Sequence, residues 1–210
     1  MSRKVDPRSL RTGVTKDWAS SWFAEKDVYA KNLLEDDKIR KYLKKALRFA
    51  GFDSARIERS IQKITVNINV SKPGIVIGRK GAGLGQIRTD LAKITKSDID
   101  LQVIEVKKPD LSAAILGENL AIQLEKRVHV KRAMNMAVKK AMESGAMGAR
   151  VEVSGTIQGP NSIANIEKVK DGSIPTLTFR ADIDYAKTTA FTRGGTIGVK
   201  VWIHKGEIKQ

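Results

Sequence analysis

The 210-residue sequence contains no cysteine, which excludes disulfide bonds, thiol catalysis and cysteine-ligated zinc. Aromatic residues make up only 5% of the chain. No stretch approaches the roughly 18 consecutive apolar residues of a membrane span. The N-terminal residues also lack the apolar segment of a signal peptide. We therefore expect a cytoplasmic protein with no membrane-spanning segment.

Acidic residues are outnumbered, because 23 Asp and Glu face 39 Lys and Arg, and the formal net charge is +16 at pH 7. An excess this large indicates a polyanionic partner, either nucleic acid or an acidic membrane. The excess is spread along the chain: residues 1–50 carry 13 − 7 = +6, residues 51–110 carry 11 − 7 = +4, and residues 111–210 carry 15 − 9 = +6. A detachable basic tail would place the charge at one end instead.

The first half of the chain alternates helical and strand patterns. The stretch "NLLEDDKIRKYLKKALRFAGF" predicts an amphipathic helix that ends at Gly51. Its apolar stripe comprises Leu34, Ile39, Leu43, Ala46 and Leu47. "KITVNINV" predicts a half-buried strand with Ile64, Val66, Ile68 and Val70 on one face. With the segments that follow, residues 33–106 predict the order α-β-β-α-α-β.

The second half predicts two helices, over 111–127 and 130–144, with Asp110 placed to cap the first. Strands are predicted in "ARVEVSGTI", "IPTLTFRADIDYA" and "GTIGVKVWIHKG", and a loop in "QGPNSIANIEKVKDG". The fold class is therefore α+β, with two helices packed on a small sheet in residues 107–207. Residues 1–32 are predicted as an extended basic arm and a short helix, in which Trp18 and Trp22 share a face as a local apolar anchor or as a base-stacking pair.

The stretch "GIVIGRKGAGLG" at residues 74–85 joins an apolar run to a glycine-spaced loop. It is not a Walker A loop, because the sequence lacks the Lys and the Ser or Thr that hold phosphate and magnesium. It is not a dinucleotide fingerprint either, because Gln86 stands where the third glycine belongs. The remaining interpretation is a GxxG turn between two short helices, which comprises Gly78, Arg79, Lys80 and Gly81. Such a turn is typical of KH modules, which clamp a nucleic-acid backbone; the alternative is a plain tight turn.

Residues 130–144 place cations and apolar side chains on opposite faces of the predicted helix. Lys131, Asn135 and Lys139 share one face, with Arg132 beside them. The apolar face comprises Val130, Met134, Ala137, Val138 and Ala141. The pattern fits a basic strip for a polyanion, or simply a solvated charged face.

Catalytic patterns are missing. His129 and His204 are far apart, and no GxSxG elbow occurs. Asp182 and Asp184 would share a strand face, which favours a structural pair beside basic neighbours over a metal site. We expect no enzyme activity, no metal, no cofactor and no small-molecule substrate.

Several stretches together carry a family resemblance. These are "KVDPRSLRTG", "NLLEDDKIRKYL", "KPGIVIGRKG", "VIEVKKPDL", "RADIDYA" and "TIGVKVWIHKGE". In this order they resemble bacterial small-subunit ribosomal protein S-three, whose KH domain is of type II. The resemblance implies a component of the small-subunit head that binds ribosomal RNA, contacts neighbouring ribosomal proteins and has no membrane partner. It also implies that the protein lines the channel where messenger RNA enters and helps to part paired messenger there.

The resemblance also suggests roles for particular residues. Messenger RNA would meet Lys131, Arg132, Asn135 and Lys139, although the family often has a cation where Asn135 stands. Ribosomal RNA would meet the arm through Arg3, Lys4, Arg8, Arg11 and Lys16. Two other functions remain open: a free KH-type RNA-binding regulator, and an RNA-acting enzyme, which should show a nucleotide loop or an acidic cluster.

Overall fold

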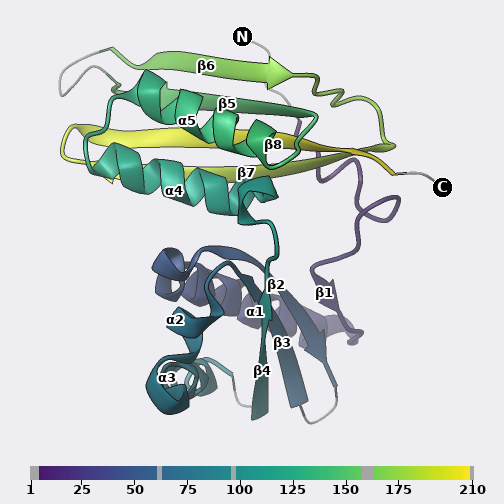
Figure 1. Cartoon of the computed structure of the whole chain (residues 1–210). Helices are drawn as coiled ribbons and strands as arrows, with labels where there is room; N and C mark the ends of the chain where they lie inside the picture. The colour runs from purple at the N-terminus through teal and green to yellow at the C-terminus, as the bar shows by residue number, and fades with distance from the viewer. Residues whose placement is uncertain (1–4, 61–62, 96–97, 158–162, 209–210) are drawn as a thin grey trace. The chain divides into compact units, whose positions relative to one another are not determined.

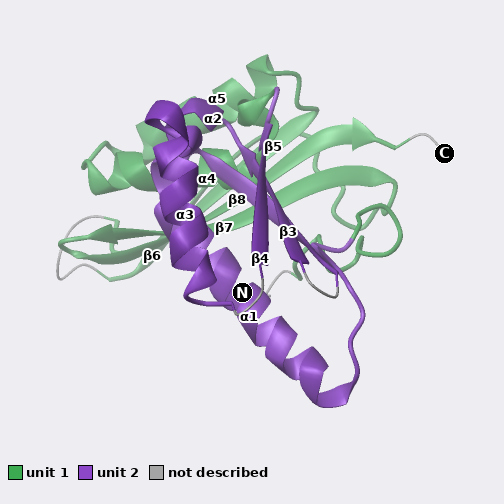
Figure 2. Cartoon of the chain, turned by 90° about the horizontal axis from the view of Figure 1, so that it is seen from below, with its two compact units in different colours: residues 1–17, 108–210 green, residues 18–107 purple. Residues whose placement is uncertain are grey.

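The computed structural model describes residues 5–60, 63–95, 98–157 and 163–208 and divides the chain into two compact units. The central unit comprises residues 18–107, and the terminal unit comprises residues 1–17 and 108–210 (Figure 2). This division differs from the predicted one at the N-terminus. Residues 1–17 group with the C-terminal half of the chain instead of forming a separate arm.

The central unit contains the predicted order of helix, two strands, two helices and strand, preceded by a two-residue strand that the sequence did not predict. The elements are β1 (Ser20–Ser21), α1 (Lys26–Ala46), β2 (Phe52–Arg59), β3 (Lys63–Val70), α2 (Pro73–Ile77), α3 (Ala82–Ala92) and β4 (Asp98–Glu105). The sheet has the order β1-β2-β3-β4. Strands β2 and β3 are antiparallel, whereas β1 pairs parallel with β2 and β4 pairs parallel with β3.

The core of the central unit lies between this sheet and its helices. The predicted buried face of β3 is confirmed, because its four apolar side chains are at most 2% exposed. The predicted stripe of α1 is confirmed at Ile39, Leu43 and Leu47, and the chain leaves the helical region at Gly51, whose φ is 72°. The stripe is wrong at Leu34, which is 62% exposed, and at Ala46, which is also exposed.

The buried carboxylate of Asp36 explains the error at the start of α1. It accepts hydrogen bonds from the Arg59 guanidinium at 2.6 and 2.9 Å, from Ser20 at 2.8 Å and from the Trp22 indole at 2.8 Å. These bonds hold residues 20–22 in an extended conformation, so the predicted short helix with Trp18 and Trp22 on one face is wrong. Trp18 is 68% exposed.

The terminal unit contains two helices and an antiparallel sheet of four strands. The elements are α4 (Ala113–Glu125), α5 (Val130–Glu143), β5 (Gly148–Gly155), β6 (Asn165–Gly172), β7 (Ala181–Thr192) and β8 (Gly195–Glu207), with strand order β6-β5-β8-β7. The helices and the strands β5 and β8 were predicted, whereas the strand predicted over 174–186 is right only from Ala181, where β7 begins. The prediction of a loop for β6 is wrong, because an edge strand that pairs only with β5 can be polar on both faces and then shows no alternation.

Both helices of the terminal unit cover one face of its sheet (Figure 1). The first helix is capped by Ser112, whose hydroxyl accepts a hydrogen bond from the Ile115 N–H at 3.3 Å. The predicted cap, Asp110, lies instead in the preceding 3-10 turn (Pro109–Leu111). The predicted apolar face of α5 is confirmed, because all five of its side chains are buried.

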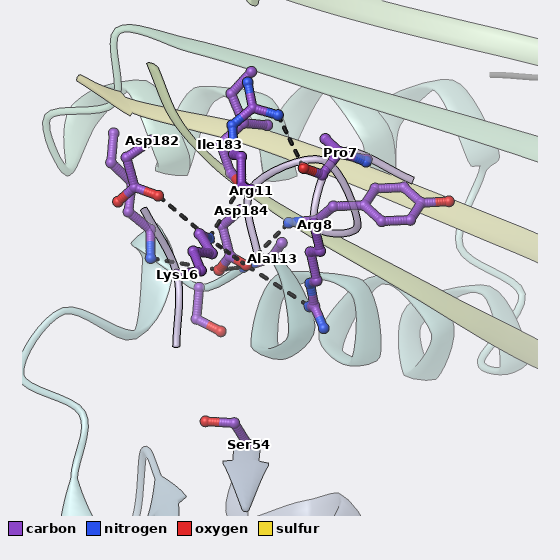
Figure 3. A network of polar contacts seen from close by, with 12 residues as sticks. Pro7, Arg8, Arg11, Lys16, Ser54, Ala113, Asp182, Ile183 and Asp184 are labelled. Atoms are coloured by element: carbon purple, nitrogen blue, oxygen red, sulfur yellow. Dashed lines mark hydrogen bonds and ion pairs between the residues drawn. The ribbon is translucent and has the colours of Figure 1, made fainter. Parts of the chain in front are cut away.

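The N-terminal segment is not the extended RNA-binding arm that the sequence predicted. Arg11 is 0% exposed, and its guanidinium donates to the main-chain carbonyl of Pro7 at 2.9 Å (Figure 3). It also donates to the carbonyls of Ala181 (2.8 Å), Thr178 (2.8 Å) and Thr176 (3.2 Å). Its assignment as an RNA contact is therefore wrong. Burial of this cation is tolerated because four carbonyl oxygens replace its hydration.

Two further cations of the segment bind carboxylates of β7. Lys16 lies 3.2 Å from Asp182 and 4.0 Å from Asp184, and Arg8 lies 3.7 Å from Asp184 (Figure 3). The two aspartates are therefore a structural pair beside basic neighbours. Arg3 and Lys4, also predicted to contact RNA, lie outside the described residues.

The carboxyl of Asp184 is the electrostatic centre of this contact. Burial raises its pKa, but Lys205 and a hydrogen bond from the Ala113 N–H act in the opposite direction. Lys16 and Arg8 add to that effect, and the net result is a pKa below the ordinary value for aspartate. Asp184 is therefore ionised at neutral pH and holds the N-terminal segment to β7 by charge.

Candidate nucleic-acid interface

The GxxG turn lies between α2 and α3 in the central unit. The chain leaves α2 at Gly78 with φ 68°, forms a 3-10 turn over Arg79–Gly81, and starts α3 after Gly81, whose φ is 82°. Lys80 also has a positive φ of 50°. Glycine adopts this left-handed region at little cost, so both glycines are explained by the turn itself.

Gly83 permits a close approach of the two helices. A Cβ at this position would lie 2.4 Å from the Val76 carbonyl oxygen and 3.1 Å from that of Ile77. A Cβ at Gly78 would in turn lie 3.0 Å from the Gly83 nitrogen. The turn is therefore fixed by main-chain contact, which only glycine allows here.

The two cations of the turn point into solvent. Arg79 and Lys80 are exposed, and neither side chain has an ion pair or hydrogen bond with another described residue. Of the three apolar residues that precede the turn, Val76 is buried, whereas Ile75 and Ile77 are 57% and 39% exposed. No side chain of the described residues caps the N-terminus of α3, so its first N–H groups can meet an anion.

The second candidate is the exposed strip of α5, in the terminal unit. Lys131, Arg132, Asn135 and Lys139 are all exposed and lie along the side of the helix opposite its buried face. Lys139 approaches Glu143 at 3.8 Å, but both side chains are more than 60% exposed, so this pair contributes little. The strip therefore offers mostly unneutralised positive charge.

The four residues of the GxxG turn lie together in the central unit. The four residues of the α5 strip lie together in the terminal unit. Of the five cations of the predicted arm, Arg8 and Lys16 meet at Asp184, Arg11 is buried among main-chain carbonyls, and Arg3 and Lys4 lie outside the described residues.

The sequence patterns indicated no role for Arg127 or Arg193. Both line a cavity beside the N-terminus of α5, together with Lys131. The available sequence signal for this cavity was a cation in each of two turns, Arg127 between α4 and α5 and Arg193 between β7 and β8.

Features of other functional classes are scarce in the part of the chain that the structure describes. There, no group of three His, Asp or Glu side chains could hold a metal ion. His204 is buried with Nδ1 3.0 Å from the Ser173 carbonyl oxygen, and His129 is exposed at the start of α5. None of the described helices is both long enough and apolar enough to cross a membrane.

Comparison with known proteins identifies two domain families in this chain. Residues 38–111 match the KH domain, and residues 120–203 match the family described as ribosomal protein S3, C-terminal domain. Small ribosomal subunit protein uS3 of Clostridium novyi (strain NT) is 44% identical over 209 residues, which cover 99% of this chain and 94% of the relative. The uS3 protein of Parvibaculum lavamentivorans is 47% identical over 208 residues, with 99% and 88% coverage. The uS3 protein of Desulforamulus reducens is 45% identical over 208 residues, with 99% and 94% coverage.

The close approach at Gly83 generates a stability prediction. We expect Gly83→Ala to lower the free energy of unfolding by about 1–3 kcal/mol, because the new methyl group meets main-chain atoms that cannot move aside. Gly85→Ala, two residues on, is the matched control. Nothing lies within 4 Å of its Cβ position, so we expect it to be neutral or to stabilise α3 by up to about 1 kcal/mol. Urea unfolding followed by circular dichroism measures both, and equal effects of the two substitutions would contradict the account.

Proposed function

The chain belongs to the uS3 family of small ribosomal subunit proteins, and from this premise we propose that it binds ribosomal RNA in the head of the subunit and contacts messenger RNA where it enters. The protein is a structural, non-enzymatic component of the cytoplasmic ribosome and has neighbouring ribosomal proteins as partners. Similarity over 99% of the chain carries this conclusion. A free KH regulator would need only the central unit, so the match over residues 120–203 favours the ribosomal function.

RNA binding by the central unit rests on the GxxG turn. Small residues let a sugar–phosphate backbone approach the main chain, and the N–H groups that begin α3 face that backbone. Arg79 and Lys80 add two charges that no described acid neutralises. Each phosphate that a cation neutralises releases counterions, which favours binding at low salt.

Messenger binding by the terminal unit rests on the α5 strip. Its exposed Lys131, Arg132 and Lys139 would hold the phosphates of the incoming strand, with Asn135 as a neutral hydrogen-bonding residue between them. Strand separation would then draw its energy from translocation, since the strip can hold a single strand but not drive its own movement. Of the described arm residues, the nearly half-exposed Arg8 is still proposed as a ribosomal RNA contact, and the same proposal stands for Arg3 and Lys4, which lie outside the described residues.

For the turn, we expect Arg79→Asp with Lys80→Asp to weaken binding of the full chain to single-stranded RNA. Asp tolerates the positive φ at position 80, so the fold should persist. The slope of log K against log salt should become shallower by roughly 0.7 for each phosphate that the variant no longer neutralises. Lys31→Asp with Lys38→Asp, on the exposed surface of α1, makes the same change in charge and is the control. A parent-like salt slope in the Arg79 and Lys80 variant would remove the clamp from the proposal.

For the strip, we expect ribosomes with Lys131→Ala and Arg132→Ala to move more slowly through paired messenger RNA. Both side chains are exposed, so subunit assembly and the speed on unpaired messenger should match the parent. Single-round translation of two messages that differ only in a hairpin measures the effect. Equal slowing on both messages, or no slowing on either, would contradict a role in strand separation.

A further inference from the structure

A cavity of about 820 Å³ lies at one end of the terminal unit, and we call it the α5 groove. The C-terminus of α4, the N-terminus of α5, the end of β5 and the turn between β7 and β8 all meet at this end (Figure 1). Glu167 of β6 also lines the groove, so five segments form it, of which the end of α4 and the start of α5 are adjacent in the sequence. Its size lies within the usual range for ligand sites, about 300–1,000 Å³.

Three cations from three of these segments line the groove. Arg127 comes from the α4–α5 connection, Lys131 from the first turn of α5, and Arg193 from the β7–β8 turn. All three are exposed, and none of their side chains has an ion pair or hydrogen bond with another described residue. Glu167 of β6 is the one carboxylate in the lining, so the charge of the lining is 3 − 1 = +2 with the histidine neutral. The groove thus favours an anion.

The turn that carries Arg193 is fixed in position. The Thr156 hydroxyl donates a hydrogen bond to the Gly194 carbonyl oxygen at 3.0 Å. Gly195 has φ 127°, and a Cβ there would lie 3.1 Å from the Thr156 hydroxyl oxygen, so the turn lies directly against the end of β5. Arg193 is therefore presented beside the groove by a supported turn and not by a free loop.

The backbone at Arg127 is also unusual. Its φ of 62° lies in the left-handed region, which side chains other than those of glycine, asparagine and aspartate rarely adopt. Its N–H still bonds the Leu124 carbonyl at 3.0 Å, and the next N–H bonds that of Gln123 at 3.1 Å, so the connection is ordered. Such local strain is typical of binding sites, where the surrounding structure holds a side chain in place.

The remaining lining is largely apolar and includes Leu124, Val128, Val130, Ile157 and Ile197. A cationic rim around an apolar surface suits a polymer that carries phosphates along one edge and flat bases along the other. Lys131 belongs both to this rim and to the exposed strip of α5. A strand that follows the strip would therefore reach the groove without leaving the positive surface.

We propose that the α5 groove binds single-stranded RNA, with Arg127 and Arg193 as phosphate contacts in addition to the α5 strip. The inference rests on the proposed contact between α5 and messenger RNA and extends it to a specific path. Thr156 is a positioning residue in this scheme, because it acts through the turn that carries Arg193.

The test is a titration of the full chain with a fluorescent 12-nucleotide uridine RNA over a series of salt concentrations. We expect Arg127→Ala with Arg193→Ala to weaken binding several-fold at low salt and to make the salt slope shallower by roughly 1.4, or about 0.7 for each of the two phosphates. The control is Arg180→Ala with Lys187→Ala, which removes the same charge from two exposed residues of the terminal unit outside the groove. We expect the control to retain most of the parent's affinity and slope.

A second variant tests the position of the turn. Thr156→Val removes the hydroxyl but keeps the shape of the side chain, so it should weaken RNA binding less than Arg193→Ala does. In the Arg193→Ala background it should have no further effect, because the turn then presents no cation. Additive effects of the two substitutions would contradict the positioning role.

Comparison with Lys131→Ala and Arg132→Ala separates the two proposals. If that variant binds RNA weakly while the Arg127 and Arg193 variant binds like the parent, the groove is wrong and the α5 contact stands. If neither variant differs from the parent, both are wrong. The proposal is also wrong if the Arg180 and Lys187 control weakens RNA binding as much as the Arg127 and Arg193 variant does. It is wrong too if a poly-glutamate peptide of the same charge binds as tightly as the RNA, because either result shows only a general attraction for anions.

Discussion

The excess of cations over acids constrains everything else in this protein. Even if each of its 23 acidic residues neutralised one of the 39 cations, sixteen cations would have no acidic partner in the chain. Unscreened, these charges repel one another and oppose compaction. The structure limits the cost by exposing its cations, because Arg11 is the one buried Lys or Arg among the described residues. A polyanion that binds there removes the repulsion and releases counterions. The charge that destabilises the isolated chain therefore favours its assembly with RNA.

The cations divide into two groups by what they contact. Arg11 and Arg59 are largely buried and satisfied by carbonyl oxygens or carboxylates, so they hold the fold together. The side chains of Arg79 and Lys80, like the cationic side chains of the α5 strip and groove, have few or no polar partners among the described residues. The second group sits on rigid supports: a glycine turn fixed by main-chain contact, the exposed side of a packed helix, and a hairpin turn bonded to the end of a strand. Such supports reduce the entropic cost of binding a ligand.

The sequence predicted the parts of this arrangement that depend on local patterns. Alternation in β3, helical spacing in α5 and the glycine spacing of the GxxG turn all act within a few residues, and the structure agrees with each. The errors involve contacts between residues far apart in the sequence. Arg11 was predicted as an RNA contact because the residues around it in the sequence are polar and basic. The carbonyls that surround its guanidinium lie some 165 to 170 residues further along the chain. The bonds of Asp36 to Arg59 of β2 and to residues 20 and 22 determine the start of α1 and the segment before it. Strand β6 shows no alternation because it lies at the edge of its sheet. The α5 groove has the same origin, since its three cations converge only after the hairpin and the helices have packed.

The account depends most on the chain being part of the small ribosomal subunit. The most direct measurement is to separate a native lysate on a sucrose gradient at moderate salt and to locate this chain with an antibody. The account predicts that it sediments with the small subunit and stays there when the salt is raised, because many phosphate contacts act together. Sedimentation at the top of the gradient as a free protein would contradict the account.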